Sequence, residues 1–157
     1  MLDIREKTIN GLNAGDVFTI TRTFSEQDMT AFAGITRDYN PIHFDDRFAA
    51  AKNFKGRICH GLLTAGMITE IGGQIGWLAT QMNFEFKKPV YFGDTITCTF
   101  TIIEVDDRGW ARAEATMQNQ DGLAVVEAWI TGRLPGSRDI EVLKAMVAEG
   151  NSTNGCR

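Results

Sequence analysis

The sequence predicts a single α+β domain, in which a curved antiparallel β-sheet wraps around one long central helix. Two features predict this fold. Residues 61–79 carry apolar side chains on more than one side of a helix, as expected of a buried helix. Residues 82–133 then hold four segments with the composition and alternation of strands, separated by turns. A length of 157 residues suits one domain with a single core.

The first third of the chain predicts one strand and two short helices. Residues 17–24 are β-branched and aromatic, which is typical of a strand. Ser25 is a suitable N-cap for the helix that follows, because two acidic residues lie in its first turn, where the helix dipole favours them. We expect this helix to end at Gly34. A pair of aspartates then opens a second short helix over residues 47–51.

The central helix is unusual in its glycine content. Each glycine costs roughly 1 kcal/mol in helix propensity relative to alanine. So many of them indicate a close approach of backbone, such as a sheet packed tightly against the helix. The alternative is that the Gly72–Gly73 pair breaks the helix into two pieces. The glycines are Gly61, Gly66, Gly72, Gly73 and Gly76.

The second half predicts an antiparallel meander. Residues 106–109 form a turn, and Asp121–Gly122 is a strong hairpin signal. Alanines facing inward on the last two strands suit a sheet wrapped closely round a helix. The predicted strands are residues 82–87, 95–102, 110–120 and 123–133.

We expect the domain to end near Pro135, so that it comprises residues 1–135. Residues 136–157 then form a tail with a possible short helix over residues 141–149 and a disordered end over residues 151–157.

Composition excludes several classes of protein. A net charge of −4 argues against wholesale binding of nucleic acid. The longest apolar stretch is interrupted by Glu70 and Gln74, and no signal peptide precedes it, so we expect a cytoplasmic protein that does not enter the membrane. Three cysteines far apart suit a reducing compartment. Neighbouring Cys59 and His60 are a poor zinc pattern, and we expect no metal site.

Residues 38–43 bring together groups that can exchange a proton. Asp38 and His43 are a candidate general acid/base pair, because they are titratable groups of different chemistry in one short segment. Pro41 directs Asn40 away from helical geometry, so we expect an extended or looped segment that turns both side chains toward one pocket. The alternative is a turn built by aspartate and asparagine side chains beside a proline.

Three ordered blocks of sequence, residues 38–45, 60–63 and 84–94, resemble the MaoC-like (R)-specific enoyl-CoA hydratases of the hotdog fold. The resemblance extends over residues 24–133 and agrees with the helix and sheet predicted above. It implies a single hotdog domain. It also implies a homodimer or a dimer of dimers, because hotdog domains usually join their sheets edge to edge.

Residue by residue, the resemblance implies Asp38 and His43 as the catalytic dyad and the Gly61 N–H as the donor that faces the thioester carbonyl. Asn40 is the motif's asparagine, which would hold the loop and shape the site. Thr69 stands where similar hydratases carry a serine; the alternative is a hydroxyl that bonds to its own helix.

Arg37 is a departure from the family's pattern, because the motif usually has glycine before the aspartate. It could alter the loop backbone or place a charge near the substrate. We expect His60 to make a structural hydrogen bond before the helix. Lys87, Lys88 and Arg57 either meet the phosphates of coenzyme A or are solvated surface charges.

The implied reaction is the (R)-specific hydration of trans-2-enoyl-CoA, or the reverse dehydration of (R)-3-hydroxyacyl thioesters, with one bound water. The partner is an acyl-CoA or acyl-carrier-protein thioester, and no cofactor is needed because coenzyme A enters as part of the substrate. Two alternatives remain open. One is a hotdog acyl-CoA thioesterase, which directs water at C1 instead of C3, and the other is a non-catalytic subunit that binds acyl thioesters.

Overall fold

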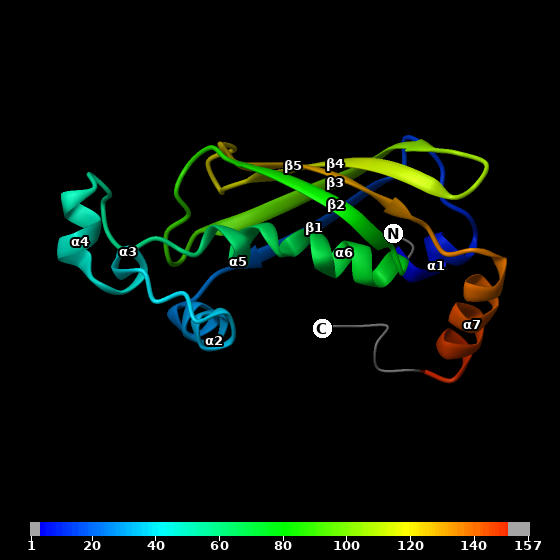
Figure 1. Ribbon diagram of the computed structural model, residues 1–157, viewed down its shortest axis with the longest axis horizontal. Helices are drawn as coiled ribbons and strands as arrows, with labels where there is room; N and C mark the ends of the chain where they lie inside the picture. The colour runs from blue at the N-terminus through cyan, green and yellow to red at the C-terminus, as the bar shows by residue number, and fades with distance from the viewer. Residues whose placement is uncertain (1–3, 151–157) are drawn as a thin grey trace.

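The computed structural model describes residues 4–150, which form one antiparallel sheet with helices against one face and at both ends (Figure 1). The strand order in the sheet is β1-β3-β4-β5-β2. The elements are α1 (Ile4–Ile9), β1 (Val17–Thr23), α2 (Glu26–Thr36), α3 (Pro41–Phe44), α4 (Asp46–Ala51), α5 (Gly61–Ala65), α6 (Met67–Ile75), β2 (Leu78–Phe86), β3 (Thr95–Val105), β4 (Trp110–Gln118), β5 (Ala124–Arg133) and α7 (Ser137–Ala148).

The core lies between the sheet and α6, as predicted. Ile68, Ile71 and Ile75 of α6 are buried against a cluster that includes Ile96 and Phe100 of β3. Burying such side chains stabilises the fold by roughly 1.5–3 kcal/mol each. The α6 helix therefore owes its stability to this packing, which outweighs the poor propensity of its glycines.

The central helix is shorter than predicted and is interrupted at a different glycine. It ends at Ile75, because Gly76 takes a left-handed conformation (φ 77°) that closes the helix. The interruption lies at Gly66, between α5 and α6, so the predicted alternative of a break at Gly72–Gly73 is wrong. A Cβ at Gly72 or Gly73 would meet no atom within 4 Å, so the close approach inferred from these two glycines is also wrong.

The sheet curves over the helix because its inner face is lined by small side chains. Ala111, Ala113 and Ala115 of β4 and Ala128 of β5 are buried, as predicted for the inward face. The tightest point is Gly132, where a Cβ would collide with the Leu78 carbonyl of the neighbouring strand. The predicted turns are also present, with Gly109 and Gly122 both at positive φ.

The α2 helix begins as predicted but does not end at Gly34. Ser25 and Asp28 form a capping box at its start. The helix continues to Thr36 and is closed by Arg37, which lies in the left-handed region (φ 63°) and donates its N–H to the Ala33 carbonyl. An arginine therefore occupies a conformation that is normally left to glycine.

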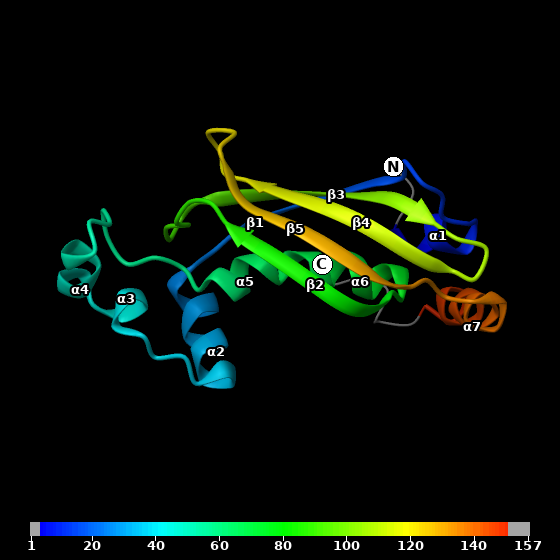
Figure 2. The ribbon, with the colours of Figure 1, turned by 45° about the horizontal axis from the view of Figure 1, so that its top comes forward.

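Apart from α5 and α6, which lie along the sheet, the helices gather at opposite ends of the molecule (Figures 1 and 2). At one end α2, α3 and α4 project beyond the sheet, and at the other α1 and α7 lie beside each other. The α1 helix was not predicted, and α7 begins at Ser137, before the helix expected over residues 141–149. The predicted disordered end over residues 151–157 lies outside the described residues. Within residues 4–150, no helix has the length and apolar character needed to cross a membrane.

Candidate active site

Asp38 and His43 lie on the segment that joins α2 to α4. Residues 37–40 have no regular secondary structure, but Pro41 begins the helical turn α3, so the expectation of an extended or looped segment is wrong for residues 41–43. Proline is suited to the first helical position, because the N–H that it lacks would have no partner within the helix. Asn40 caps this turn by accepting the Ile42 N–H on its side-chain oxygen at 3.2 Å. The turn carries His43 into the protein interior, where 7% of its surface stays exposed.

Asp38 and His43 face each other across a gap. Nε2 of His43 lies 3.9 Å from Oδ2 of Asp38, which is too long for a direct hydrogen bond. The other carboxylate oxygen, Oδ1, accepts the backbone N–H of Asn40 at 3.1 Å. Oδ2 is therefore the oxygen that faces His43, and a group placed between it and Nε2 would contact both residues.

The hydrogen bonds of His43 decide which of its nitrogens accepts a proton. Nδ1 lies 2.8 Å from the carbonyl oxygen of Ile58, and a carbonyl can only accept, so Nδ1 carries the hydrogen in the neutral ring. Nε2 then has a free lone pair that faces Asp38. Burial lowers the pKa of His43, and nearby His60 adds to this, while the bond to Ile58 and the charge of Asp38 act in the opposite direction.

His60 is the second histidine of the site. As predicted, it makes a hydrogen bond before the helix, but its partner is the dyad itself: Nε2 donates to the backbone carbonyl of Asp38 at 2.9 Å. Its ring stacks on His43 with centroids 3.8 Å apart and is 1% exposed. Sequence reasoning missed this contact, because nothing in the spacing shows that the two segments meet.

Asp38, His43, His60 and Gly61 line one cavity of about 730 Å³. Gly61 begins α5, and within the described residues its N–H makes no hydrogen bond. The ring of Phe86 packs so closely on Gly61 that an added Cβ would lie 2.7 Å from it. The close approach inferred from the glycine content is therefore present here. Within the described residues, the Gly61 N–H is thus a donor without a partner on the same cavity as the dyad.

Asp38, His43 and His60 also form the kind of cluster that can hold a metal ion, since their ligand atoms lie within 4.8 Å of one another. The geometry does not fit one. The two rings are stacked with planes only 27° apart, so their lone pairs run side by side instead of converging on one point. In addition, Nε2 of His60 carries the hydrogen that bonds to Asp38.

The three cations considered for phosphate binding differ in their surroundings. Lys87 forms ion pairs with Glu85 and Glu127, and Arg57 pairs with Glu26 at 2.5 Å. Lys88 is exposed, lines the dyad cavity, and has no ion pair within the described residues. Of these three side chains, Lys88 is therefore the one free to meet an anion.

The comparisons agree with this geometry. The sequence profile of the MaoC-like domain matches residues 12–124. The chain belongs to the MaoC-like domain family. Its match to the (R)-specific enoyl-CoA hydratase of Rhodospirillum rubrum is 37% identical over 58% of this chain and 66% of that protein. The 3-hydroxybutyryl-CoA dehydratase of Methylorubrum extorquens is 28% identical over 96% of this chain and 98% of that protein.

The lengths of the relatives differ. The chain spans less than two thirds of the Rhodospirillum relative and 56% of a mitochondrial 3-hydroxyacyl-[acyl-carrier-protein] dehydratase of Arabidopsis thaliana. Among solved structures, the (R)-hydratase of Aeromonas caviae superposes with a TM-score of 0.75 and 28% identity, over 80% of this chain and 98% of that one. This likeness confirms the hotdog fold.

Three of the predicted site residues, Arg37, Asn40 and Thr69, lie outside the lining of the dyad cavity. Arg37 is exposed and precedes Asp38 directly. The hydroxyl of Thr69 donates to the Gly66 carbonyl at 2.6 Å, within its own helix. For Arg37, Thr69 and Asn40 alike, contact with a substrate stays a prediction.

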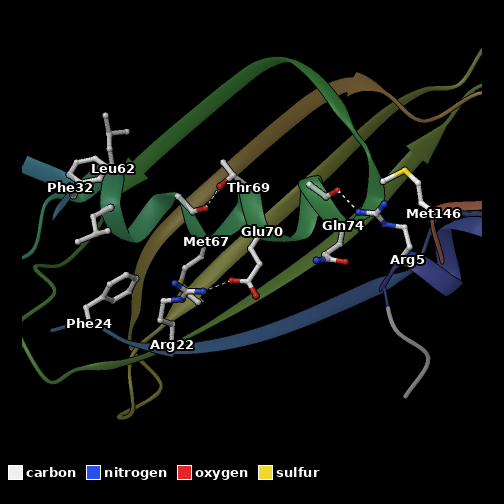
Figure 3. Close-up of a pocket in the computed structure, with 13 residues that line it drawn as sticks. Arg5, Arg22, Phe24, Phe32, Leu62, Met67, Thr69, Glu70, Gln74 and Met146 are labelled. Atoms are coloured by element: carbon white, nitrogen blue, oxygen red, sulfur yellow. Dashed lines mark hydrogen bonds and ion pairs between the residues drawn. The ribbon is translucent and has the colours of Figure 1, made fainter. Parts of the chain in front are cut away.

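Thr69 instead lines a second cavity of about 730 Å³ along the outer side of α5 and α6 (Figure 3). Arg22 and Glu70 point toward one another there and form an ion pair at 2.7 Å. At the far end, the guanidinium of Arg5 donates to the Gly73 carbonyl at 3.2 Å. No histidine lines this cavity, Arg22 and Glu70 pair with each other, and Arg5 bonds to a backbone carbonyl, so we assign the chemistry to the dyad cavity.

Proposed function

We propose that this chain catalyses the (R)-specific hydration of trans-2-enoyl thioesters, or the reverse dehydration of (R)-3-hydroxyacyl thioesters. The observation that carries the proposal is the 3.9 Å gap between Oδ2 of Asp38 and Nε2 of His43. With Asp38 ionised and His43 neutral, both atoms are hydrogen-bond acceptors. They suit one water molecule that donates a hydrogen to each and turns its lone pair toward the substrate.

Each step follows from this arrangement. The water oxygen forms a bond to C3, while the electrons of the C2–C3 double bond move through the conjugated system to the thioester oxygen. One of the dyad residues takes a proton from the water, and a proton then returns to C2, so that water is added in full. A positioned acid/base pair typically accelerates such a step by about 10²–10⁴-fold.

The Gly61 N–H is suited to the negative charge that develops on the thioester oxygen. It is an unpaired donor on the same cavity as the dyad. One such donor contributes roughly 3 kcal/mol to stabilisation of the transition state. The proposed reaction therefore uses no metal and no cofactor, because the dyad supplies the proton transfer and the Gly61 N–H supplies the electrostatic stabilisation.

We propose that the substrate is a thioester of coenzyme A or of an acyl carrier protein. Both carriers have phosphate groups, and Lys88 is a free cation on the cavity. The names of the relatives support either carrier, because they include an enoyl-CoA hydratase and a 3-hydroxyacyl-[acyl-carrier-protein] dehydratase. We further propose a cytoplasmic homodimer. The free edge of β2 supports pairing, because it is a nine-residue edge strand with Leu78, Met82 and Phe86 exposed.

The test is the hydration of a short trans-2-enoyl-CoA, followed by loss of the conjugated-thioester absorbance and by chiral analysis of the product. Asp38→Asn and His43→Gln should each reduce the rate by at least about 10²-fold while the circular dichroism spectrum stays unchanged. Asp107→Asn, in the exposed β3–β4 turn, is the matched control and should retain full activity.

The alternatives give different products. Release of free coenzyme A without a 3-hydroxyacyl product would favour the thioesterase. Tight binding of the enoyl-CoA without turnover at any chain length would favour a binding subunit. An (S)-3-hydroxyacyl product would contradict the proposed stereochemistry.

A further inference from the structure

Two segments of the chain exchange a pair of histidine-to-carbonyl hydrogen bonds at the dyad. His43 of the first segment (residues 38–43) donates from Nδ1 to the carbonyl of Ile58, at 2.8 Å. In return, His60 of the second segment (residues 58–60) donates from Nε2 to the carbonyl of Asp38, at 2.9 Å. The two rings stack between these bonds, with centroids 3.8 Å apart. Each member of the dyad is thus bonded to the same three-residue segment.

Asp38 depends on this exchange more than His43 does. Its other hydrogen bonds are local: its N–H reaches the Thr36 hydroxyl at 3.4 Å, and Oδ1 accepts the Asn40 N–H. Among the hydrogen bonds of residues 4–150, the bond from His60 is the one that ties Asp38 to a distant part of the chain. The preceding residue, Arg37, is in a left-handed conformation that is unfavourable for a side chain with a Cβ. Asp38 therefore needs an outside tether to hold its place.

The second segment is itself bonded to the connection between β2 and β3. The Cys59 N–H donates to the Val90 carbonyl at 2.7 Å, in the connection between β2 and β3, and Ile58 pairs with Tyr91. Phe32 of α2 also packs against the His60 ring, with centroids 5.2 Å apart. His60 thus links the segment bonded to the β2–β3 connection to the backbone of Asp38 in the projecting part of the molecule.

We propose that His60 is a positioning residue, which holds the Asp38 carboxylate opposite Nε2 of His43 through its hydrogen bond to the Asp38 carbonyl. The inference rests on the proposed function for its effect on the reaction, but the coupling between the two dyad residues is measurable without any turnover. A displacement of about 1 Å in a catalytic group is enough to reduce a rate by about 10²-fold. His60 does not itself need to touch the substrate.

The kinetic test compares two substitutions at the same position. His60→Phe keeps the buried aromatic ring and its stacking but removes the donor, whereas His60→Gln keeps an N–H donor but removes the ring. We expect His60→Phe to reduce kcat by about 10²-fold with KM within about threefold of the wild type. The kcat of His60→Gln should be at least tenfold higher than that of His60→Phe. If the two variants lose activity in proportion to their loss of folded protein, the positioning role is overturned.

The decisive test is independent of activity. The chain has two histidines, so in His60→Phe the remaining imidazole signal in an NMR titration belongs to His43. The charge of Asp38 raises the pKa of His43, so Asp38→Asn should lower it in the otherwise wild-type chain. In the His60→Phe chain the same substitution should lower the pKa of His43 by less than half as much, because Asp38 is no longer held beside it.

The other charged groups on the cavity, Lys87 and Lys88, are identical in all four chains and cancel from this comparison. An equal effect of Asp38→Asn in both backgrounds would overturn the proposal. If the wild-type protein hydrates no enoyl thioester but the coupling is lost in His60→Phe, the positioning role stands and the proposed function falls. If the wild-type protein hydrates an enoyl thioester and the coupling persists in His60→Phe, the proposed function stands and the positioning role falls.

Discussion

Oδ2 of Asp38 and Nε2 of His43 face each other across 3.9 Å, and the hydrogen of the neutral His43 ring is committed to the carbonyl of Ile58 on the other side. The site therefore presents a lone pair, and not an N–H, toward the carboxylate. This arrangement requires a third group with hydrogens to give. Water is both the smallest such group and the second substrate of the proposed reaction.

The activity should depend on pH through His43. Because burial lowers the pKa of this residue, the acid limb of kcat/KM should have its midpoint below 6.5, the value for an unperturbed histidine. Below that midpoint Nε2 gains a proton and can no longer accept the hydrogen of the water, so activity should fall about tenfold per pH unit. A profile measured from pH 4.5 to 8 checks this, and a midpoint above 6.5 would contradict it.

Gly61→Ala should reduce activity through a steric contact. The new Cβ would lie 2.7 Å from the ring of Phe86, so either the ring or the start of α5 must move, and movement of α5 displaces the Gly61 N–H. We expect a loss in kcat of up to about 10²-fold, as for removal of one oxyanion donor. Phe86→Ala removes the contact, so adding Gly61→Ala to the Phe86→Ala chain should cost less activity than adding it to the wild-type chain. Additive effects of the two substitutions would contradict this.

Arg37→Gly should stabilise the protein, because Arg37 has φ 63° and glycine adopts that conformation without strain. Relief of about 1–2 kcal/mol of strain is offset by the greater freedom of glycine in the unfolded chain, so we expect a gain of about 0.5–1 kcal/mol in denaturant unfolding. Arg37→Ala removes the same charge but keeps the Cβ and should give no gain.

The same pair of variants tests the predicted substrate contact of Arg37. If the guanidinium meets the substrate, both variants raise KM. If the conformation alone matters, KM stays unchanged in both.

Lys88→Ala should weaken binding of the carrier and leave the chemical step intact. Among residues 4–150, Lys88 has no ion-pair partner on the dyad cavity, whereas Lys87 forms ion pairs with Glu85 and Glu127. We expect Lys88→Ala to raise KM for an enoyl-CoA about three- to tenfold at low salt, with kcat unchanged, and the difference to shrink as salt screens the charge. Lys87→Ala is the matched control with a smaller effect. Equal effects of the two variants would contradict the assignment.

Sequence reasoning succeeded where local chemistry decides the structure. The Ser25 cap, the two glycine turns and the inward alanines of the sheet are all set by neighbours within a few residues. It failed for the break in the central helix, because the five glycines have the same propensity, which does not select Gly66 over the others. The α1 helix was missed because its buried residues, Arg5 and Thr8, are polar and give no apolar period.

The motif was enough to propose the dyad, but not the hydrogen bonds that hold its two residues in place. His43 and Ile58 are 15 residues apart and Asp38 and His60 are 22 apart, and each pair bonds through a backbone carbonyl that carries no sequence signal. The tautomer of His43 follows from its bond to Ile58 alone.

The dyad lies in the part of the molecule that projects beyond the sheet, while the core lies between the sheet and α6 (Figure 2). Among the described residues, few hydrogen bonds join this projecting part to the rest of the molecule, chiefly those through Ile58 and His60. Local opening of such a segment needs less free energy than unfolding of the core. Thermal inactivation should therefore precede melting of the sheet, and amide exchange around α3 should be faster than in β3 to β5. The time for which the dyad stays in place is then governed by how firmly this end is held, rather than by the strength of the core.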